Sequence, residues 1–232
     1  FQAEALLMLC AAGALESLSL WRERRLPWAL ALSWVCFTCA GLIKVIPLLW
    51  LGLPLLMVQL SSNPQGQAPP LQTLPGRMLR LLERPGFWLY IGTSLMAIAG
   101  WYWHAHQLGQ TSGLSFGFWG SGADRSSISL LLDLNGWINL LLRVSLRLLA
   151  VVGVPFLLIG LRASWRSGGG QISISGLVGV LLCTIATMRS STIHEYYQLP
   201  LLLFSSPLIG LGWQTWHQRQ PRWQPRLLLS LA

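Results

Sequence analysis

Long apolar runs separated by short polar connections follow one another along almost the whole chain. The runs are rich in Leu, Ile, Val, Ala and Trp and contain few charged side chains, which is typical of helices that lie in a bilayer. The pattern predicts about seven spans plus the start of an eighth, at 5–20, 28–43, 45–60, 87–106, 144–161, 171–188 and 198–214, and from 227 onward. We therefore expect an all-α fold, a polytopic transmembrane helix bundle that forms a single domain over residues 1–232.

Composition and charge support this class of protein. Hydrophobic residues make up 53% of the 232 residues and charged residues 10%, whereas a soluble domain usually carries about 25% charged residues. The formal net charge is +9. Because the basic residues lie between apolar runs, this charge indicates membrane topology and not a nucleic-acid partner.

The basic residues are concentrated in every second connection, which orients the chain. Eleven of the sixteen fall in connections that share one side if the spans alternate, namely 22–25, 61–86, 162–166 and 219–226. The positive-inside rule makes that side cytoplasmic. The 61–86 loop contains a candidate interfacial helix among its Leu and Arg residues. The 107–142 loop is then extracytoplasmic, and it also contains a candidate interfacial helix, within "SISLLLDLNGWINLLLRV".

Charged side chains near membrane depth are costly and usually functional, and three of them fall on the predicted external side. Lys44 interrupts "CAGLIKVIPLLW", Arg189 follows an apolar run, and Glu4 begins one. Lys44 and Arg189 suit a phosphate headgroup, but each also suits a cation that reaches water from a helix end. No local motif decides between these alternatives.

The most polar cluster in the second half of the chain is "STIHEYYQLP", residues 191–200. His194 and Glu195 either face a site or cap the helix that follows, where a negative charge is favourable. Tyr196 and Tyr197 either contact a ligand or belong to the belt of aromatic residues at the membrane interface.

Two further motifs could bind a metal. His104 and His106 form an H-x-H motif, but no third ligand is adjacent, so no metal site is assigned and a divalent metal cofactor stays open. Cys36 and Cys39 form a C-x-x-C motif inside an apolar run, where the thiolate is strongly disfavoured. We expect these cysteines, with Cys10 and Cys183, to be structural.

Three segments together resemble the GT-C superfamily of membrane glycosyltransferases, in particular its bacterial protein-mannosyltransferase-like and aminoarabinose-transferase-like members. "STIHEYYQLPLLLFSSPLIGLG" has the family's His, paired Tyr, Leu-Pro and second Pro. "LSWVCFTCAGLIKVIPLLWLGLPLL" is similar to a helical hairpin in which a Lys, here Lys44, precedes a Pro, here Pro47. "FQAEALLMLC" resembles a segment in which an acidic residue, here Glu4, opens a helix.

The resemblance implies transfer of a sugar from a polyprenyl-phosphate-linked donor to a glycan, lipid or protein acceptor. The reaction would take place on the extracytoplasmic side of the bacterial inner membrane. Binding of the donor phosphate is implied for Lys44, Arg189 and His194. A place in the site wall or in contact with the acceptor is implied for Glu4, Glu195, Tyr196 and Tyr197.

The family's catalytic acidic residue lies in the first external loop, and the chain starts with Phe1. The resemblance therefore implies a fragment that lacks the N-terminal part and the catalytic base. Two other functions remain open from the residues: a transporter or flippase of a lipid-linked intermediate, and a non-catalytic subunit of a membrane assembly. Membrane lipids are expected partners in all three cases.

Overall fold

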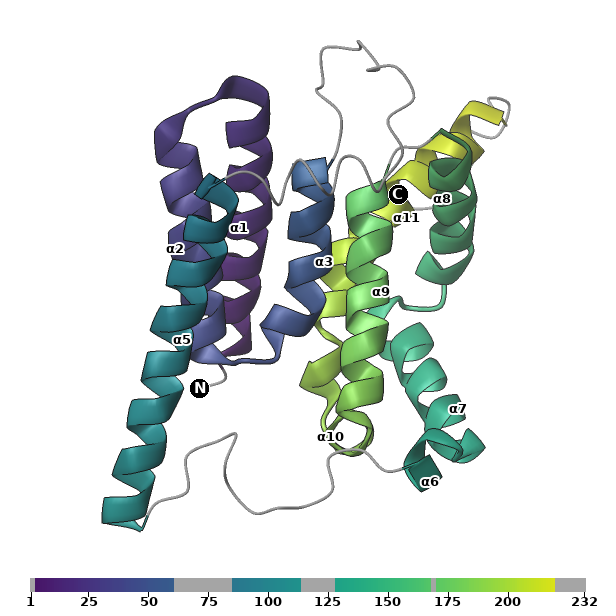
Figure 1. The fold of residues 1–232 in the computed structure, drawn as a ribbon. Helices are drawn as coiled ribbons and strands as arrows, with labels where there is room; N and C mark the ends of the chain where they lie inside the picture. The colour runs from purple at the N-terminus through teal and green to yellow at the C-terminus, as the bar shows by residue number, and fades with distance from the viewer. Residues whose placement is uncertain (1–2, 61–84, 114–127, 168–169, 220–232) are drawn as a thin grey trace. The chain divides into compact units, whose positions relative to one another are not determined.

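The computed structural model describes residues 3–60, 85–113, 128–167 and 170–219. Within these residues the regular structure is helical and contains no strand, which confirms the all-α prediction. The chain divides into two compact units, residues 1–125 and 126–232 (Figure 1). The candidate interfacial helix of the 61–86 loop and the eighth apolar run lie outside the described residues.

In unit 1, the connections between successive helices use prolines and one residue with a left-handed backbone. Its described helices are α1 (Glu4–Arg24), α2 (Pro27–Ile43), α3 (Pro47–Leu60) and α5 (Pro85–Ser112). Arg25 ends α1 with φ 55°, and its N–H donates to Trp21 O at 2.8 Å. Proline begins the next helices without the loss of a helical hydrogen bond, because the first N–H groups of a helix have no partner within it.

Small and hydroxyl-bearing residues hold α1, α2 and α5 together. The Ser33 hydroxyl of α2 donates to Ala14 O of α1 at 2.8 Å and lies 3.0 Å from the Tyr90 hydroxyl of α5. One turn further along the same helices, the Thr38 hydroxyl donates to Ser94 Oγ at 3.0 Å. Small residues and hydroxyl pairs of this kind are typical of contacts between membrane helices, where polar groups must be satisfied inside the protein.

Helix α5 is longer than its apolar run. It continues to Ser112, past the predicted end at residue 106, so the predicted external loop does not begin at 107. The polar stretch "QLGQTS" forms the last turns of the helix. The hydroxyls of Thr111 and Ser112 donate back to the carbonyl of Leu108, which satisfies them without the need for a loop.

Unit 2 contains short helices at one end and longer helices that pack together. In chain order they are α6 (Ile128–Leu131), α7 (Leu134–Arg143), the π-helical η2 (Val144–Leu148), α8 (Gly153–Ser167), α9 (Gln171–Ala186), α10 (Met188–Ile193), the 3-10 helix η3 (Glu195–Gln198) and α11 (Pro200–Arg219). Helices α6 and α7 lie in the segment that was predicted to hold an interfacial helix.

The prediction of one continuous helix over 144–161 is wrong. The helix breaks between Leu148 and Gly153, and the pieces Leu134–Leu148 and Gly153–Trp165 meet at 99°. Ala150 and Val151 adopt positive φ angles of 50° and 60°, which residues with a Cβ rarely adopt. The break is bridged by a hydrogen bond from Val151 N to Ser145 O of 2.7 Å. The apolar sequence "RLLAVVG" gives no local signal for this turn.

Two glycines bring α8 and α11 into backbone contact. A Cβ added at Gly160 would lie 1.8 Å from Leu208 O, and one added at Gly212 would lie 1.9 Å from Phe156 O. Glycine at these two positions therefore permits the close approach of the helices, as small residues do in pairs of membrane helices.

We expect Gly212→Ala to destabilise the protein by about 1–3 kcal/mol, because the added methyl group must push the two backbones apart. Gly210→Ala is the matched control. It lies on the same helix, and a Cβ there meets nothing within 4 Å, so helix propensity alone should make it neutral or up to about 1 kcal/mol stabilising. Denaturant titration of both variants in one detergent measures the difference. Equal unfolding free energies would contradict the close crossing.

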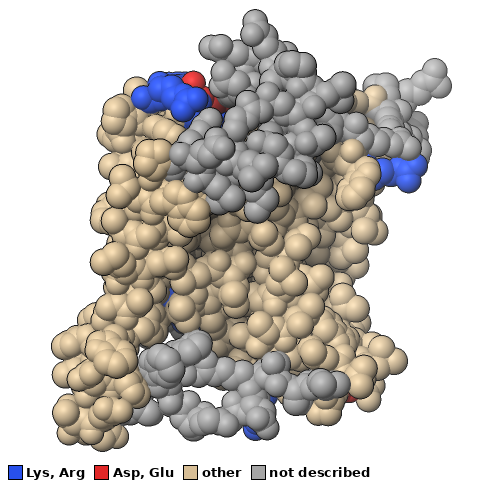
Figure 2. All heavy atoms as spheres, viewed as in Figure 1, with Lys and Arg blue, Asp and Glu red and all other residues tan. Residues whose placement is uncertain are grey.

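The helices expose large apolar side chains. On α5, Trp88, Met96 and Trp103 are exposed, with Met96 75% exposed. On the face visible in Figure 2, most of the Lys, Arg, Asp and Glu atoms that can be seen lie toward the upper and lower parts of the view, with tan atoms between them. Exposed apolar surface of this extent marks contact with lipid or with other proteins.

Among the described helices, α1 is both long and apolar enough to cross a membrane. The bent pair Leu134–Leu148 and Gly153–Trp165 meets the same condition if it is counted as one span, whereas α2, α3 and α9 are apolar but shorter.

Candidate functional site

The polar side chains of unit 2 gather where α7 and η2 lie against α10 and η3. The Asp133 carboxylate caps α7 by accepting from Asn135 N at 3.0 Å. Helix α7 is strongly amphipathic, and Arg143 and Arg147 follow each other by four residues. This spacing places both guanidinium groups on one side of the helix.

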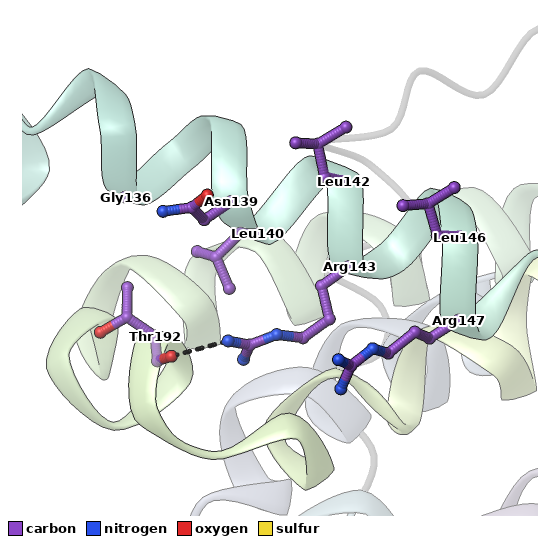
Figure 3. Close-up of a pocket in the computed structure, with 8 residues that line it drawn as sticks. All are labelled: Gly136, Asn139, Leu140, Leu142, Arg143, Leu146, Arg147 and Thr192. Atoms are coloured by element: carbon purple, nitrogen blue, oxygen red, sulfur yellow. Dashed lines mark hydrogen bonds between the residues drawn. The ribbon is translucent and has the colours of Figure 1, made fainter.

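A pocket of about 330 Å³ lies beside these two arginines. It is lined by Gly136, Asn139, Leu140, Leu142, Arg143, Leu146, Arg147 and Thr192. In Figure 3 the side chains of Arg143 and Arg147 point toward the segment that carries Thr192, whereas Leu142 and Leu146 point away from it. The pocket therefore has a cationic wall next to leucine side chains, a combination that suits the boundary between a charged headgroup and a hydrocarbon chain.

The backbone of α10 fixes Arg143 in position. Its guanidinium donates to Ser191 O at 3.3 Å and to Thr192 O at 2.9 Å, and its Nε lies 4.0 Å from Glu195 Oε1. A guanidinium has five N–H donors, so these two bonds leave donors for a ligand. Arg143 is a half-buried cation that is held before any ligand arrives.

Glu195 balances part of the positive charge. Its carboxylate accepts a hydrogen bond from Arg147 and faces Arg143. Two arginines and one glutamate leave a formal charge of +1 at the pocket. Since the side chains of Arg147 and Glu195 are 65% and 54% exposed, water screens this pair and the two residues can separate when an anion binds.

The aromatic residues next to Glu195 form a stack. The ring centres of His194 and Tyr196 are 5.1 Å apart with planes at 18°, and those of Tyr196 and Tyr197 are 4.9 Å apart at 27°. Behind the stack, the buried Gln198 side chain donates to Ser191 O at 2.6 Å. The exposed His194 and half-buried tyrosines thus present a ring surface that is attached to the same segment as Arg143.

The structure also pairs two residues that the sequence placed on one side. The Lys44 ammonium, at the end of α2, donates to the carboxylate of Glu4, at the start of α1. Glu4 is buried and Lys44 is half-buried. The pair neutralises a carboxylate that would otherwise be costly to remove from water.

The predicted site residues thus fall into two groups. Lys44 and Glu4 pair in unit 1, and the residues of "STIHEYYQLP" lie together in unit 2. Convergence of Lys44 with Arg189 and His194 stays a prediction. Arg189 is exposed, and the pocket is lined by other cations.

Neither Arg143 nor Arg147 was among the candidate residues from the sequence, because Arg147 falls inside the predicted span 144–161 and Arg143 directly before it. Their i, i+4 spacing in an amphipathic segment was the signal that could have identified them. Their partner Glu195 was among the predicted residues.

The histidines and cysteines of the described segments do not assemble a metal centre. No group of three or more His, Cys, Asp or Glu side chains suited to a metal occurs there. His106 is 3.0 Å from the Gln110 side chain, and the ring centre of His104 is 6.3 Å from that of Trp101. The four cysteines are free thiols, and Cys183 is buried in α9.

Comparison with known proteins gives no match: no protein-family model, no curated protein and no solved structure is significantly similar to this chain. The resemblance to the GT-C superfamily therefore depends on the sequence motifs alone and stays a prediction.

Proposed function

We propose that this chain is part of a multi-pass membrane glycosyltransferase that uses a polyprenyl-phosphate-linked sugar on the extracytoplasmic side. The observation that carries the proposal is Arg143, a cation held by two backbone carbonyls at the wall of a pocket with net positive charge. Departure of a lipid phosphate from the sugar creates negative charge, and a cation fixed in advance stabilises that charge.

The surroundings of the pocket suit this donor. Leu142 and Leu146 lie beside the arginines and offer apolar contact to the isoprenoid chain. The rings of His194, Tyr196 and Tyr197 are available to contact a sugar or an acceptor. The proposed membrane location is supported by the apolar runs, the exposed apolar side chains and α1, which can cross a bilayer.

The test is transfer from a radiolabelled polyprenyl-phosphate sugar by the protein in proteoliposomes. Pentose, hexose and aminopentose donors are compared, because the pocket does not identify the sugar. Release of the lipid phosphate together with labelling of an acceptor supports the proposal. A protein that binds the donor but never releases the phosphate contradicts it.

A transporter or flippase of a lipid-linked intermediate is the second candidate, and the broken helix favours it. Transporters commonly bind substrates at discontinuous helices, and the break after Leu148 lies close to Arg147. The same proteoliposomes separate the candidates: movement of a fluorescent lipid-linked sugar between leaflets, without cleavage, identifies a flippase.

The proposed topology predicts opposite accessibility for two positions in a Cys-free background. A Cys at Ser167 should react only with a reagent inside the cell, and a Cys at the exposed Gln110 only with one outside. The distribution of basic residues is the physical reason. Labelling of intact and permeabilised cells with a membrane-impermeant maleimide measures this. External labelling at Ser167 would reverse the orientation and move the proposed site to the cytoplasmic side.

A further inference from the structure

An apolar pocket of about 480 Å³ lies in unit 1, where α1 and α3 end and α2 and α5 begin (Figure 1). All four helices contribute to its wall, which includes the side chains of Leu18, Trp21, Leu30, Leu55, Phe87 and Ile91. Phe37 and Tyr90 also line the pocket, with ring centres 5.8 Å apart. The lining residues of the Arg143 pocket all belong to unit 2, so this is a separate pocket.

Among the described residues that line this apolar pocket, Arg25 alone is charged. Its guanidinium carbon is 5.3 Å from the centre of the Trp21 ring, a distance at which a cation and an aromatic face attract each other. Arg22 and Arg24 lie in the last turn of the same helix. With Glu23, these residues give a formal charge of +2, since three arginines are opposed by one glutamate.

Open space at one glycine shows that the pocket can accept more atoms. Gly52 of α3 lines the pocket, and a Cβ added there would have no heavy atom within 4 Å. The same holds for Gly86 at the start of α5. A flexible hydrocarbon chain can fill such a space without displacing the helices.

We propose that this pocket binds one acyl chain of an anionic phospholipid whose phosphate lies at Arg25. An apolar cavity with cationic residues at one end complements a molecule with a hydrocarbon tail and a negative head. The inference depends on the membrane location in the proposed function, but not on sugar transfer. Arg25 falls on the predicted cytoplasmic side, where anionic lipids are attracted to basic residues beside a span.

The test is a lipid-binding measurement on the delipidated chain in detergent. Phosphatidylglycerol, phosphatidylcholine and inorganic phosphate are titrated separately, and bound molecules are counted by native mass spectrometry. We expect one phosphatidylglycerol to bind about fivefold more tightly than phosphatidylcholine, as one basic residue near a lipid surface provides. Tighter binding of inorganic phosphate than of phosphatidylglycerol would contradict a lipid site.

Two pairs of variants test binding of the acyl chain and binding of the phosphate separately. Gly52→Leu should fill the pocket and weaken phosphatidylglycerol at least about tenfold, equivalent to displacing two methylene groups. Gly100→Leu is its control, because a Cβ there also meets nothing within 4 Å but lies outside the pocket. Arg25→Asn tolerates the left-handed backbone and should abolish the preference for phosphatidylglycerol, whereas Arg24→Gln, which removes a charge that does not line the pocket, should keep it.

Wild-type affinity in Gly52→Leu, or an unchanged lipid preference in Arg25→Asn, would overturn the proposal. If Gly52→Leu fails to fold by thermal denaturation, the Arg25 and Arg24 pair still decides the question. Arg143→Ala is measured alongside. Its lipid count should be unchanged even where sugar transfer is lost, so failure of the lipid site and failure of the glycosyltransferase proposal give different results.

Discussion

If the proposed sugar transfer takes place at this pocket, replacement of Arg143 by Ala should lower its rate about 100- to 1000-fold. Loss of one group that is fixed in advance toward charge developing in the transition state commonly has an effect of this size. Arg143 fits this role because α10 carbonyls hold its guanidinium at the pocket wall. Arg143→Lys should restore part of the rate, since the charge survives but the planar fork does not. The measurement is turnover in proteoliposomes, normalised to folded protein.

Three comparisons decide whether Arg143 acts on the phosphate. Arg189→Ala should lose no more than about fivefold, because Arg189 is exposed and screened by water. Tyr196→Phe should lose about tenfold at most, the value of one ordinary hydrogen bond. Glu195→Gln should lower the KM for the donor, since it raises the local charge from +1 to +2. A larger loss of transfer rate in Arg189→Ala than in Arg143→Ala would indicate that the phosphate binds at Arg189, as the sequence resemblance implied.

The structural contribution of Arg143 must be separated from its proposed chemistry. Its bonds to Ser191 and Thr192 also hold α10 against α7, so the Ala variant can lose stability as well as rate. Arg147→Ala supplies the complementary test, because the Arg147 side chain is 65% exposed and bonds to Glu195. If thermal denaturation shows that Arg143→Ala is unfolded, a rise in donor KM in folded Arg147→Ala supports the cationic pocket. An unchanged KM there contradicts it.

The existence of most helices could be predicted from the positions of the apolar runs along the chain. An apolar run in this chain can satisfy its backbone polar groups within one segment only as a helix, and α2, α3 and α9 fall where the runs are. The ends of the helices were harder to predict. The polar residues after His106 extend α5 because Thr111 and Ser112 bond to their own helix, a possibility that a hydropathy pattern does not register.

The break after Leu148 could not be predicted from local sequence. Ala150 and Val151 disfavour positive φ, so the turn contradicts local propensity and must be stabilised by the packing of the surrounding unit. Because of this break, the predicted span 144–161 did not indicate that residues near its start line a pocket. Once the segment is divided, Arg143 ends the amphipathic helix α7, Arg147 lies in η2, and the guanidinium of Arg143 contacts α10.

The contact between Lys44 and Glu4 agrees with the sequence-based expectation that both residues lie on the same side of the helices. The alternation of spans put both residues at the same ends of neighbouring helices, and the structure brings them into contact. Which alternative for Lys44 holds, a phosphate ligand or a structural cation, depends on energies that the sequence does not contain.

The second large effect is expected for the Lys44–Glu4 pair and is measured by a double-mutant cycle. Lys44→Met should lower the free energy of unfolding by about 3 kcal/mol. Removing the cation leaves the Glu4 side chain, only 10% exposed, without its opposite charge, and an uncompensated buried charge typically costs about 3–5 kcal/mol. Glu4→Gln should cost about 1 kcal/mol, because Lys44 is 30% exposed and can reach water. Denaturant titration in detergent measures all four proteins.

The double variant Glu4→Gln/Lys44→Met should be more stable than Lys44→Met alone, since no buried charge remains. Additive losses would show that the pair is not coupled. Addition of a polyprenyl phosphate then distinguishes the two alternatives for Lys44, a structural cation or a phosphate ligand. If Lys44 is a structural cation, a polyprenyl phosphate raises the melting temperature of the double variant as much as that of the unsubstituted protein. If it binds the phosphate, that shift is lost in the double variant and kept in Glu4→Gln, because Lys44 keeps its positive charge in Glu4→Gln.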